Sequence, residues 1–466
     1  MNDSAVVADA PARTGLRIPR MAALALLSTA MFVVVLDTSM VNLAGFAIRD
    51  GLNLSATELT VVVDAYLIAF AGLLLLGGRL ADVFGGRRIF LIGMAIYVAA
   101  SAFCAVAVNA PMLIVGRVGQ GIGAAVVIPA ALALVLALYR TRTERTKALG
   151  IWGAVTGLGS LTGVFLGGTI TEVFGWPAVF WAPVPVGVVV GFLIWRTLPR
   201  FPGTPGRFDG VGAATITLSI AALALGFVSA AESGWVAPAS WLGLLIGVIS
   251  LGAFIRVEAR SSHPLVPLSV FTRIPVVVAS VMVLAIGATM TSMFFFLPLY
   301  QQEVLGMDGI TTGLTQIPLA VMTIASSALA PVVAQRMGIR PAIRLALVLM
   351  IAGLMWLTLN PETDGFSLHL LGAFLLLGSG IGMGMVNTIA MAVRDSDDDE
   401  SGLLSGLVNA AQALGGALGL AALAGIAIAA AGSHTEMSFT AAFLGGAALV
   451  LIALTVSLIP LSRNQR

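Results

Sequence analysis

Apolar stretches of about twenty residues recur along the whole of this 466-residue chain and constrain its fold more than any other feature. A helix of that length spans the hydrocarbon core of a bilayer and satisfies its own backbone hydrogen bonds there. Hydrophobic residues make up 59% of the chain and charged residues only 10%. Since a soluble domain carries roughly 25% charged residues, the sequence predicts an all-α integral membrane protein.

Fourteen apolar stretches are long enough to be transmembrane helices. They are expected at 21–45, 57–78, 89–108, 111–138, 148–170, 177–195, 210–230, 240–256, 275–300, 311–334, 342–359, 367–391, 402–430 and 439–461. If the chain starts inside the cell, 22 of its 24 lysines and arginines fall in inner segments, as the positive-inside rule requires. Removing one helix would move every later loop to the opposite side, so the pattern predicts an even number of helices with both termini cytoplasmic.

Several classes of protein are excluded or disfavoured by what the chain lacks. The single cysteine, Cys104, rules out an intrachain disulfide and a cysteine-based metal site, and the three histidines are scattered. The sequence contains no G-x-x-x-x-G-K-[ST] loop, which argues against an ATP-driven pump. We therefore expect no metal, no nucleic-acid partner and no enzymatic activity.

Two short segments recur in the same order in the two parts of the chain. ADVFGGRR at 81–88 resembles AQRMGIRP at 334–341, and GQGIG at 119–123 resembles GSGIG at 378–382, with offsets of 253 and 259 residues. Parallel repeats of this kind are typical of transporters. They predict a cytoplasmic tail at 1–20 and an N-terminal six-helix bundle at 21–200. Two inserted helices would follow at 201–260, and the C-terminal six-helix bundle with a short tail would occupy 261–466.

Three ionisable residues, Asp37, Asp64 and Arg117, lie inside predicted helices, where each costs roughly 2.5–3.5 kcal/mol to insert. All three lie roughly 9–12 Å below the outer helix ends and could share one layer. An arginine can keep one carboxylate ionised while the other, desolvated, exchanges a proton. We expect Asp37 to carry the proton and Arg117 to hold Asp64. The alternative is an ion pair that contributes only packing specificity.

Several motifs carry a resemblance to a known family. GGRLADVFGGRR at 77–88 resembles the loop signature of the major facilitator superfamily. Motifs of its fourteen-span drug:proton antiporter branch are similar to LDTSMVN (36–42), LIVGRVGQGIGAA (113–125), GLGSLTGVFLGG (157–168), FLPLYQQEVLG (296–306) and GLVNAAQALGGALG (406–419). VNLAG at 41–45 is similar to methylenomycin-type antibiotic-resistance exporters. The resemblance runs from about residue 21 to 460.

The resemblance implies the major facilitator fold and proton-coupled efflux of a hydrophobic or amphipathic small molecule, such as an antibiotic, by alternating access. It implies a monomer in a bacterial inner membrane, with the proton gradient in place of a cofactor. The implied cytoplasmic gate loop contains Gly78, Asp82, Gly85, Arg87 and Arg88, and the implied antiporter motif contains Gly159, Gly163, Gly167 and Gly168.

The chain departs from the branch at three places. Val164 stands where the antiporter motif usually has proline, which removes a point at which the helix could kink. APVP at 182–185 replaces the usual Asn-x-Pro, and Phe46 stands where the first motif commonly ends in proline. The hinge role of the antiporter motif is therefore in question for this chain.

Further polar and soft apolar residues inside the predicted helices are candidates for a substrate cavity. They are Asn42, Tyr66, Gln120, Met290, Phe294, Gln316, Asn387, Asn409 and Gln412. Each could instead make an ordinary interhelical hydrogen bond or core contact. DSDDDE at 395–400 is expected to be a solvated acidic loop. The alternative functions are import or symport of a small polar nutrient, and a receptor or scaffold without transport.

Overall fold

The computed structural model describes most of the chain. The described residues are 18–139, 141–199, 209–234, 237–261, 264–265, 268–359, 368–394, 398–431 and 437–459. Among them there is no strand, and thirteen helices are long and apolar enough to cross a membrane. The acidic segment 395–400 lies partly outside the described residues.

The helices of the first half are α1 (Arg20–Leu43), α2 (Gly45–Leu52), α3 (Ala56–Phe84), α4 (Gly86–Ala105), α5 (Ala110–Leu138), α6 (Arg142–Phe174), α7 (Pro177–Trp181) and α8 (Pro183–Thr197). The hairpin α9 (Gly210–Ser233) and α10 (Pro238–Glu258) follows, and then a short 3-10 helix, η1 (Leu268–Thr272). The second half contains α11 (Ile274–Glu303), α12 (Gly309–Met337), α13 (Ile339–Thr358), α14 (Leu368–Val393), α15 (Asp398–Ala429) and α16 (Phe439–Val456).

Each predicted span coincides with one of these helices, with α7 and α8 together forming the sixth. The chain divides that span at Ala182, because the following Pro183 has no backbone N–H to continue the helix. The fifth span, α6, is longer than expected, and its described apolar part is Leu158–Phe174. It runs through Val164 as one helix, which agrees with the missing proline.

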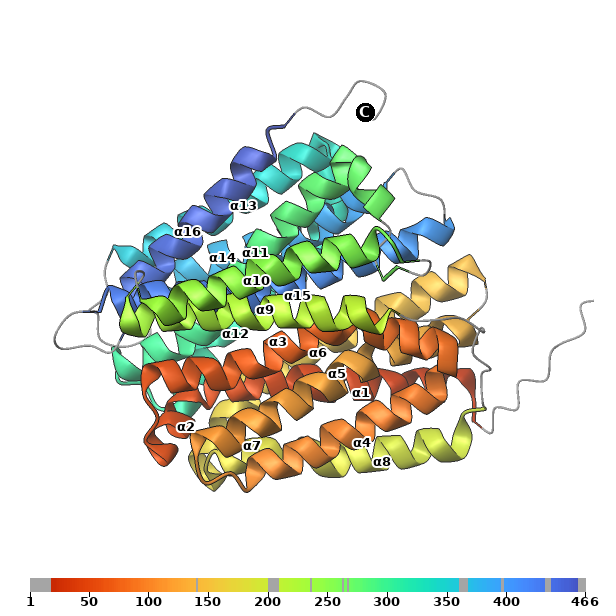
Figure 1. Ribbon diagram of the computed structural model, residues 1–466, viewed down its shortest axis with the longest axis horizontal. Coiled ribbons are helices and arrows are strands. Elements are labelled where there is room, and N and C mark those ends of the chain that lie inside the picture. Colours follow the sequence, from red (N-terminus) through yellow and green to blue (C-terminus); the bar gives the residue numbers. More distant parts are fainter. Residues whose placement is uncertain are drawn as a thin grey trace, which may run out of the picture.

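The two sets of six long helices use the same packing partners. In the first half α3 and α4 pack on α5, and α1 packs on α6; in the second half α12 and α13 pack on α14, and α11 packs on α15. The halves meet along two seams, α6 with α12 and α3 with α15. Figure 1 shows the helices side by side along the long axis, the first half in red to yellow and the second in green to blue.

The glycine contacts correct the register that the sequence predicted for the second repeated segment. Gly121 approaches Tyr66, Ala69 and Phe70 of α3, and Gly378 approaches Leu319, Met322 and Thr323 of α12. The three residues contacted in α12 are each numbered 253 higher than their counterparts in α3. The two glycines differ by 257, whereas the sequence match of 119–123 with 378–382 gave 259. The glycine-rich letters matched two residues out of register, because G-x-G recurs within each segment.

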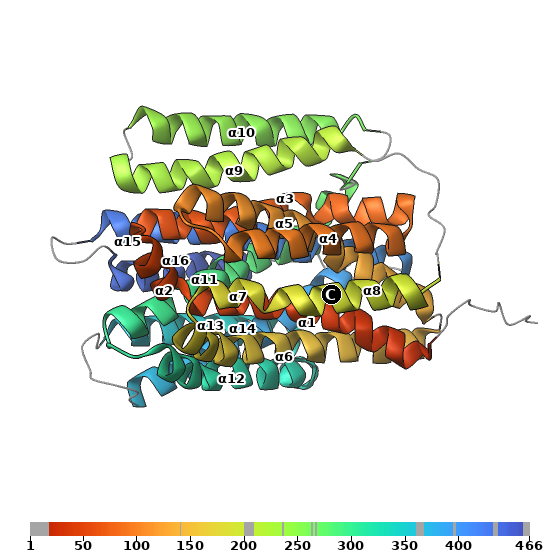
Figure 2. The same cartoon turned by 90° about the horizontal axis from the view of Figure 1, so that it is seen from below.

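The hairpin α9–α10 breaks the similarity between the two seams. Helix α9 packs against both α3 and α15, and α10 packs against α9. The hairpin therefore covers the α3–α15 seam from one side, as Figure 2 shows along the top of the molecule. Large apolar side chains of α10, including Trp241 and Leu245, are exposed and face the position of lipid. The domain boundaries at 200 and 260 remain predictions.

Candidate functional site

Asp37 of α1 lies at the centre of a buried polar network in the first half. Its carboxylate oxygen Oδ2 is 3.7 Å from Nη1 of Arg117 and accepts a hydrogen bond of 3.2 Å from Nε2 of Gln120. Gln120 also donates to Oγ of Ser101 at 2.8 Å. Asp37 and Gln120 are fully buried and Arg117 is 1% exposed, so water does not screen this network.

Arg117 is held from three further directions. Its Nη1 donates a 2.8 Å hydrogen bond to Oε1 of Gln120, and its Nε donates a 3.4 Å hydrogen bond to the carbonyl of Val62. The guanidinium carbon lies 4.5 Å from the centre of the Tyr66 ring, within cation–π distance. A single glutamine thus bridges the acid and the base, which fixes the geometry of the pair.

The glycines of α6 place α1, and with it Asp37, against the rest of the half. Gly159, Gly163 and Gly167 approach Phe32, Leu36 and Met40, one turn after another. A Cβ on Gly163 would lie 2.7 Å from the carbonyl oxygen of Leu36, closer than two such atoms can approach. The predicted antiporter motif is therefore a packing surface for α1 beside Asp37. Gly168, in contrast, faces Gly309 of α12 across the seam between the halves.

Asp64 lies on the opposite face of α3 from Arg117 and does not join Asp37 and Arg117, whatever its depth in the helix. Residues two apart on a helix point to opposite sides, and Tyr66 of the same helix faces Arg117. Val61 and Ile68, which lie on the face of Asp64, pack with α9 and α15 through Ala224 and Ala421. Asp64 is 2% exposed, and neither of its carboxyl oxygens has a hydrogen-bond partner. Arg117 therefore pairs with Asp37, and the expected pairing with Asp64 is wrong.

The structure distributes the cavity candidates over several environments. Tyr66 and Gln120 join the Asp37 network, and Asn42 is buried elsewhere on α1. Gln316 donates to Gln301 at 3.0 Å, which makes it part of a buried pair between α11 and α12. The remaining candidates differ in burial: Met290, Phe294 and Gln412 are half-buried, Asn387 is buried with an unpartnered Nδ2, and Asn409 is exposed.

Two residues of α4 belong to the network but did not appear among the sequence candidates. Ser101 receives the hydrogen bond from Gln120, and the Tyr97 hydroxyl lies near Asp37 without a hydrogen-bond partner. Oδ1 of Asp37 is also unpartnered. Both residues are polar groups inside an apolar span at a similar depth, which is the signal that would have found them.

The predicted gate loop 77–88 is helical except at Gly85, which joins α3 to α4 and whose φ of 90° is strained for any residue with a side chain. Arg87 donates to the carbonyl of Trp195, near the end of α8. Arg340 of the second repeat does the same for α16, donating to Ser457 at 2.8 Å and also to Ile459. Arginines near helix C-termini satisfy free carbonyls and the helix dipole. Because both repeats have this contact, we call Arg87 a helix clamp, an arginine that holds the end of a neighbouring helix.

Several contacts join the halves at the end of the bundle that carries α2, the outer end by the loop charges. Arg49 and Glu303 form an ion pair of 2.8 Å, and Gln302 donates to the carbonyl of Leu43 at 3.1 Å. Gly313 of α12 lies against the carbonyl of Val164 on α6. The two halves are therefore in direct contact at this end. Among the described residues, no three His, Cys, Asp or Glu side chains are placed to hold a metal ion.

Comparison with known proteins identifies relatives over nearly the whole chain. The family model described as Major Facilitator Superfamily matches residues 27–420. The cephamycin export protein CmcT of Amycolatopsis lactamdurans is 35% identical, over 94% of this chain and 92% of that protein. The methylenomycin A resistance protein of Bacillus subtilis is 28% identical, over 100% and 98% respectively.

Solved structures share the fold. The crystal structure of the POT family transporter PepTSo superposes with a TM-score of 0.70 at 15% identity, covering 94% of this chain and 97% of that one. Such a likeness at low identity establishes the architecture alone. It agrees with the all-α membrane fold predicted from the sequence.

Proposed function

This chain belongs to the Major Facilitator Superfamily, and from that premise we propose that it exports a hydrophobic or amphipathic small molecule, such as an antibiotic, in exchange for protons. The relatives named for cephamycin export and methylenomycin A resistance support the direction and the substrate class. The cell membrane of a bacterium, a monomeric transporter and cytoplasmic termini are part of the same proposal.

The observation that carries the coupling is an unpartnered carboxyl at a seam between the halves. Asp64 is buried with both oxygens unpartnered, on the face of α3 that meets α9 and α15. A buried carboxylate without a partner is costly, whereas its neutral form is far less so. Asp64 therefore holds a proton in this outer-closed state. Because α3 and α15 belong to different halves, their relative motion changes the access of water to this group.

Asp37 and Arg117 have the complementary role. The ion pair and the bridging Gln120 keep opposite charges together inside one half. The charge on Asp37 thus stays balanced while the halves move. This division of labour is the reverse of the one expected from the sequence, in which Asp37 carries the proton. A proton moving inward releases about 2.3 kcal/mol per 100 mV of membrane potential.

Alternating access follows from the two seams. The contacts of Gly168 with Gly309 and of Arg49 with Glu303 close the outer end, and their separation would open it. Helix α6 moves as one body with α1 because its glycines are packed on α1. The substrate and the proton would therefore be exchanged by rocking of rigid halves, as in other two-repeat transporters.

The first test measures drug accumulation in cells that express the wild type, Asp64→Asn or Asp37→Asn, each with and without a protonophore. Wild-type cells should accumulate less drug than vector cells, and the protonophore should abolish the difference. Asp64→Asn should lose the proton-driven part, worth up to about fiftyfold in the gradient at 100 mV. Asp50→Asn, an exposed carboxylate on α2, is the matched control and should behave like the wild type.

Three results would contradict the proposal. Equal accumulation in wild-type and vector cells across a drug panel would remove the exporter. Efflux that survives collapse of the proton gradient would remove the coupling. If Asp64→Asn kept full proton coupling and Asp37→Asn lost it, Asp37 rather than Asp64 would be the proton carrier.

The alternative of nutrient import predicts the opposite direction of transport. Everted membrane vesicles with an acidic lumen should accumulate the drug if the chain is an exporter. A reporter fused after Gly234, between α9 and α10, should be found outside the cell. An inside location would overturn the predicted topology.

A further inference from the structure

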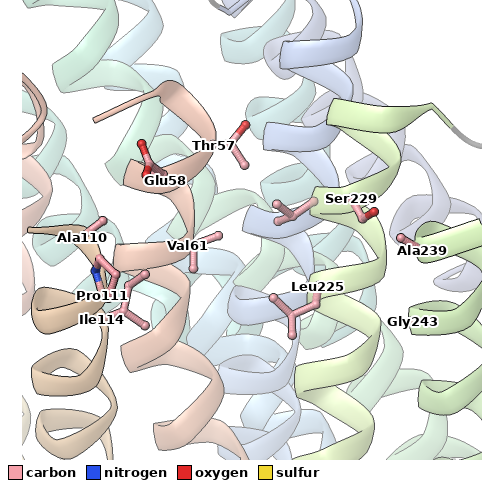
Figure 3. Close-up of a pocket in the computed structure, with 11 residues that line it drawn as sticks. Thr57, Glu58, Val61, Ala110, Pro111, Ile114, Leu225, Ser229, Ala239 and Gly243 are labelled. Atoms are coloured by element: carbon pink, nitrogen blue, oxygen red, sulfur yellow. The ribbon is translucent and has the colours of Figure 1, made fainter. Parts of the chain in front are cut away.

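We propose that the hairpin α9–α10 forms, with α3 and α5, a lateral groove that binds small lipophilic cations from the outer part of the membrane. The groove is a cavity of about 490 Å³, within the usual range for ligand sites of roughly 300–1,000 Å³. Figure 3 shows it between α3 and α5 on one side and the hairpin on the other. This binding site does not depend on the transport cycle proposed above.

The wall of the groove is apolar and belongs to four helices. Val61 of α3, Ile114 of α5 and Leu225 of α9 line its middle. Small residues, Ala110 of α5 and Ala239 of α10, leave the space that larger side chains would fill. Because Leu225 of the lining is 53% exposed, the groove is open at the surface and a hydrophobic solute can reach it from the side.

A carboxylate without a counter-ion lies at the end of this apolar groove. Glu58 lines it from the first turn of α3, and its Oε2 accepts hydrogen bonds from the backbone and the hydroxyl of Ser55 at 2.8 and 3.0 Å. Its Oε1 makes no hydrogen bond or ion pair with the described residues. Glu58 therefore keeps one acceptor oxygen free to meet a cation.

On the four helices of the groove, no described basic residue lies in the turns that flank Glu58, and Arg117 lies one turn below Ile114. The described basic residues on the four helices are Arg79, Arg117 and Arg256. Arg79 lies 21 residues along α3 from Glu58, or roughly 30 Å away, and Arg256 is in the last turn of α10. Arg117 is committed to Asp37 and Gln120. The groove therefore combines an apolar wall with an uncompensated negative rim, which selects an apolar cation over a neutral or anionic solute.

The carboxyl of Asp64 lies below the groove and, because it is neutral in the proposed outer-closed state, it adds no charge to the rim. It follows Val61, which lines the groove, by three residues on the same face of α3. Both of its oxygens are unpartnered, and it is 2% exposed. A cation in the groove would lie above this carboxyl with one helical turn between them. The occupant we infer is a lipophilic organic cation, and a lipid acyl chain is the outcome that the experiment distinguishes.

The test uses two ions of nearly equal size and opposite charge, tetraphenylphosphonium and tetraphenylborate. Their equilibrium binding is measured to the full chain in phosphatidylcholine nanodiscs, with empty nanodiscs as background. The wild type should bind the phosphonium saturably and the borate no more than the background. Glu58→Gln, which keeps an oxygen for the Ser55 contacts, should weaken phosphonium binding about fivefold.

Ala239→Trp fills the groove and should abolish saturable binding. Val248→Trp, on the exposed face of α10, and Glu172→Gln, an exposed residue of α6 outside the groove, are matched controls that should bind like the wild type. Each variant is accepted only if it elutes as a single monodisperse species. Binding that is equal for both ions, absent from the wild type, or unchanged in both Glu58→Gln and Ala239→Trp would overturn the proposal. If wild-type protein binds the phosphonium but wild-type cells show no drug efflux, only the proposed function is overturned.

Discussion

The two halves of this protein share a packing skeleton but differ in what they bury. Gly163 approaches Leu36 on α1, and Gly419 approaches Ala288 on α11, so positions on α11 correspond to those on α1 with an offset of 252. By that offset Asp37 corresponds to Thr289. Positions on α14 correspond to those on α5 with an offset of 257, and there the polar partners of Asp37 are replaced by apolar residues. Arg117 corresponds to Phe374 and Gln120 to Leu377.

This difference separates the requirements of folding from those of function. Phe374, Leu377 and Thr289 are fully buried like their counterparts, so the second half builds the same core without a charge. Replacing a buried ion pair by apolar residues is often neutral or stabilising. The Asp37–Arg117 pair is therefore not needed to hold a six-helix unit together, which favours a functional reason for its presence in the first half.

The largest effect is expected from Arg117→Leu. It leaves Asp37 as an uncompensated buried charge and should destabilise the protein by about 3–5 kcal/mol. Phe374→Leu at the corresponding position should cost less, because it only removes apolar volume. Thermal unfolding of the purified protein in detergent provides the measurement.

The double variant Asp37→Asn with Arg117→Leu should recover part of this loss, since it removes both charges. If Arg117→Leu and Phe374→Leu destabilised the protein equally little, an unpaired Asp37 would carry no energetic cost. The proposed contrast between the two halves would then be wrong.

An intermediate effect is expected where the halves are alike. Gly163→Ala and Gly419→Ala should each cost about 1–3 kcal/mol of stability, because the new methyl groups would lie within 2.7 Å and 2.3 Å of neighbouring atoms. Gly406→Ala in α15, which meets nothing within 4 Å, is the matched control. Gly163→Ala should also reduce efflux beyond the effect of Gly419→Ala, because Gly163 packs beside Asp37. Equal efflux at equal stability would argue against that link.

The smallest effect is expected at the inner helix ends. Arg87→Leu removes a contact to the carbonyl of Trp195 and should cost about 1–2 kcal/mol. Arg340→Leu should cost less, because Arg344 still donates to the carbonyl of Ser457 at 3.0 Å. Unfolding temperatures of both variants, compared in one detergent, would decide the order. A larger loss of stability in Arg340→Leu would show that Arg344 does not compensate for the lost contact.

Much of the architecture could be predicted, because it is written in local patterns. The membrane class, the helix positions and the repeat follow from hydropathy and short motifs, and the structure agrees with the helices and the fold. Gly85 and Gly338 have φ values of 90° and 91° at matching positions, so the similarity of 81–88 with 334–341 is physical. The register of 119–123 against 378–382 was wrong, because repeated glycines match equally well two residues apart.

The candidate site was predicted only in part. Asp37, Arg117, Gln120 and Tyr66 come together as polar residues at one depth should. Gln316 instead pairs with Gln301 on a neighbouring helix. Such a partner depends on how two consecutive helices turn their faces towards each other, and the sequence of either helix alone does not specify that.

The sequence by itself determined that this chain lies in a membrane as two related six-helix units with an inserted pair. It also determined the depth of its intramembrane charges, because depth depends only on position along a helix. Only the tertiary structure decided which carboxylate meets Arg117. Asp64 and Tyr66 are two residues apart and point to opposite sides of α3, so the side chain that faces α5 is set by how the helices pack. That packing leaves Asp37 paired inside one half and Asp64 unpartnered at the seam beneath the hairpin.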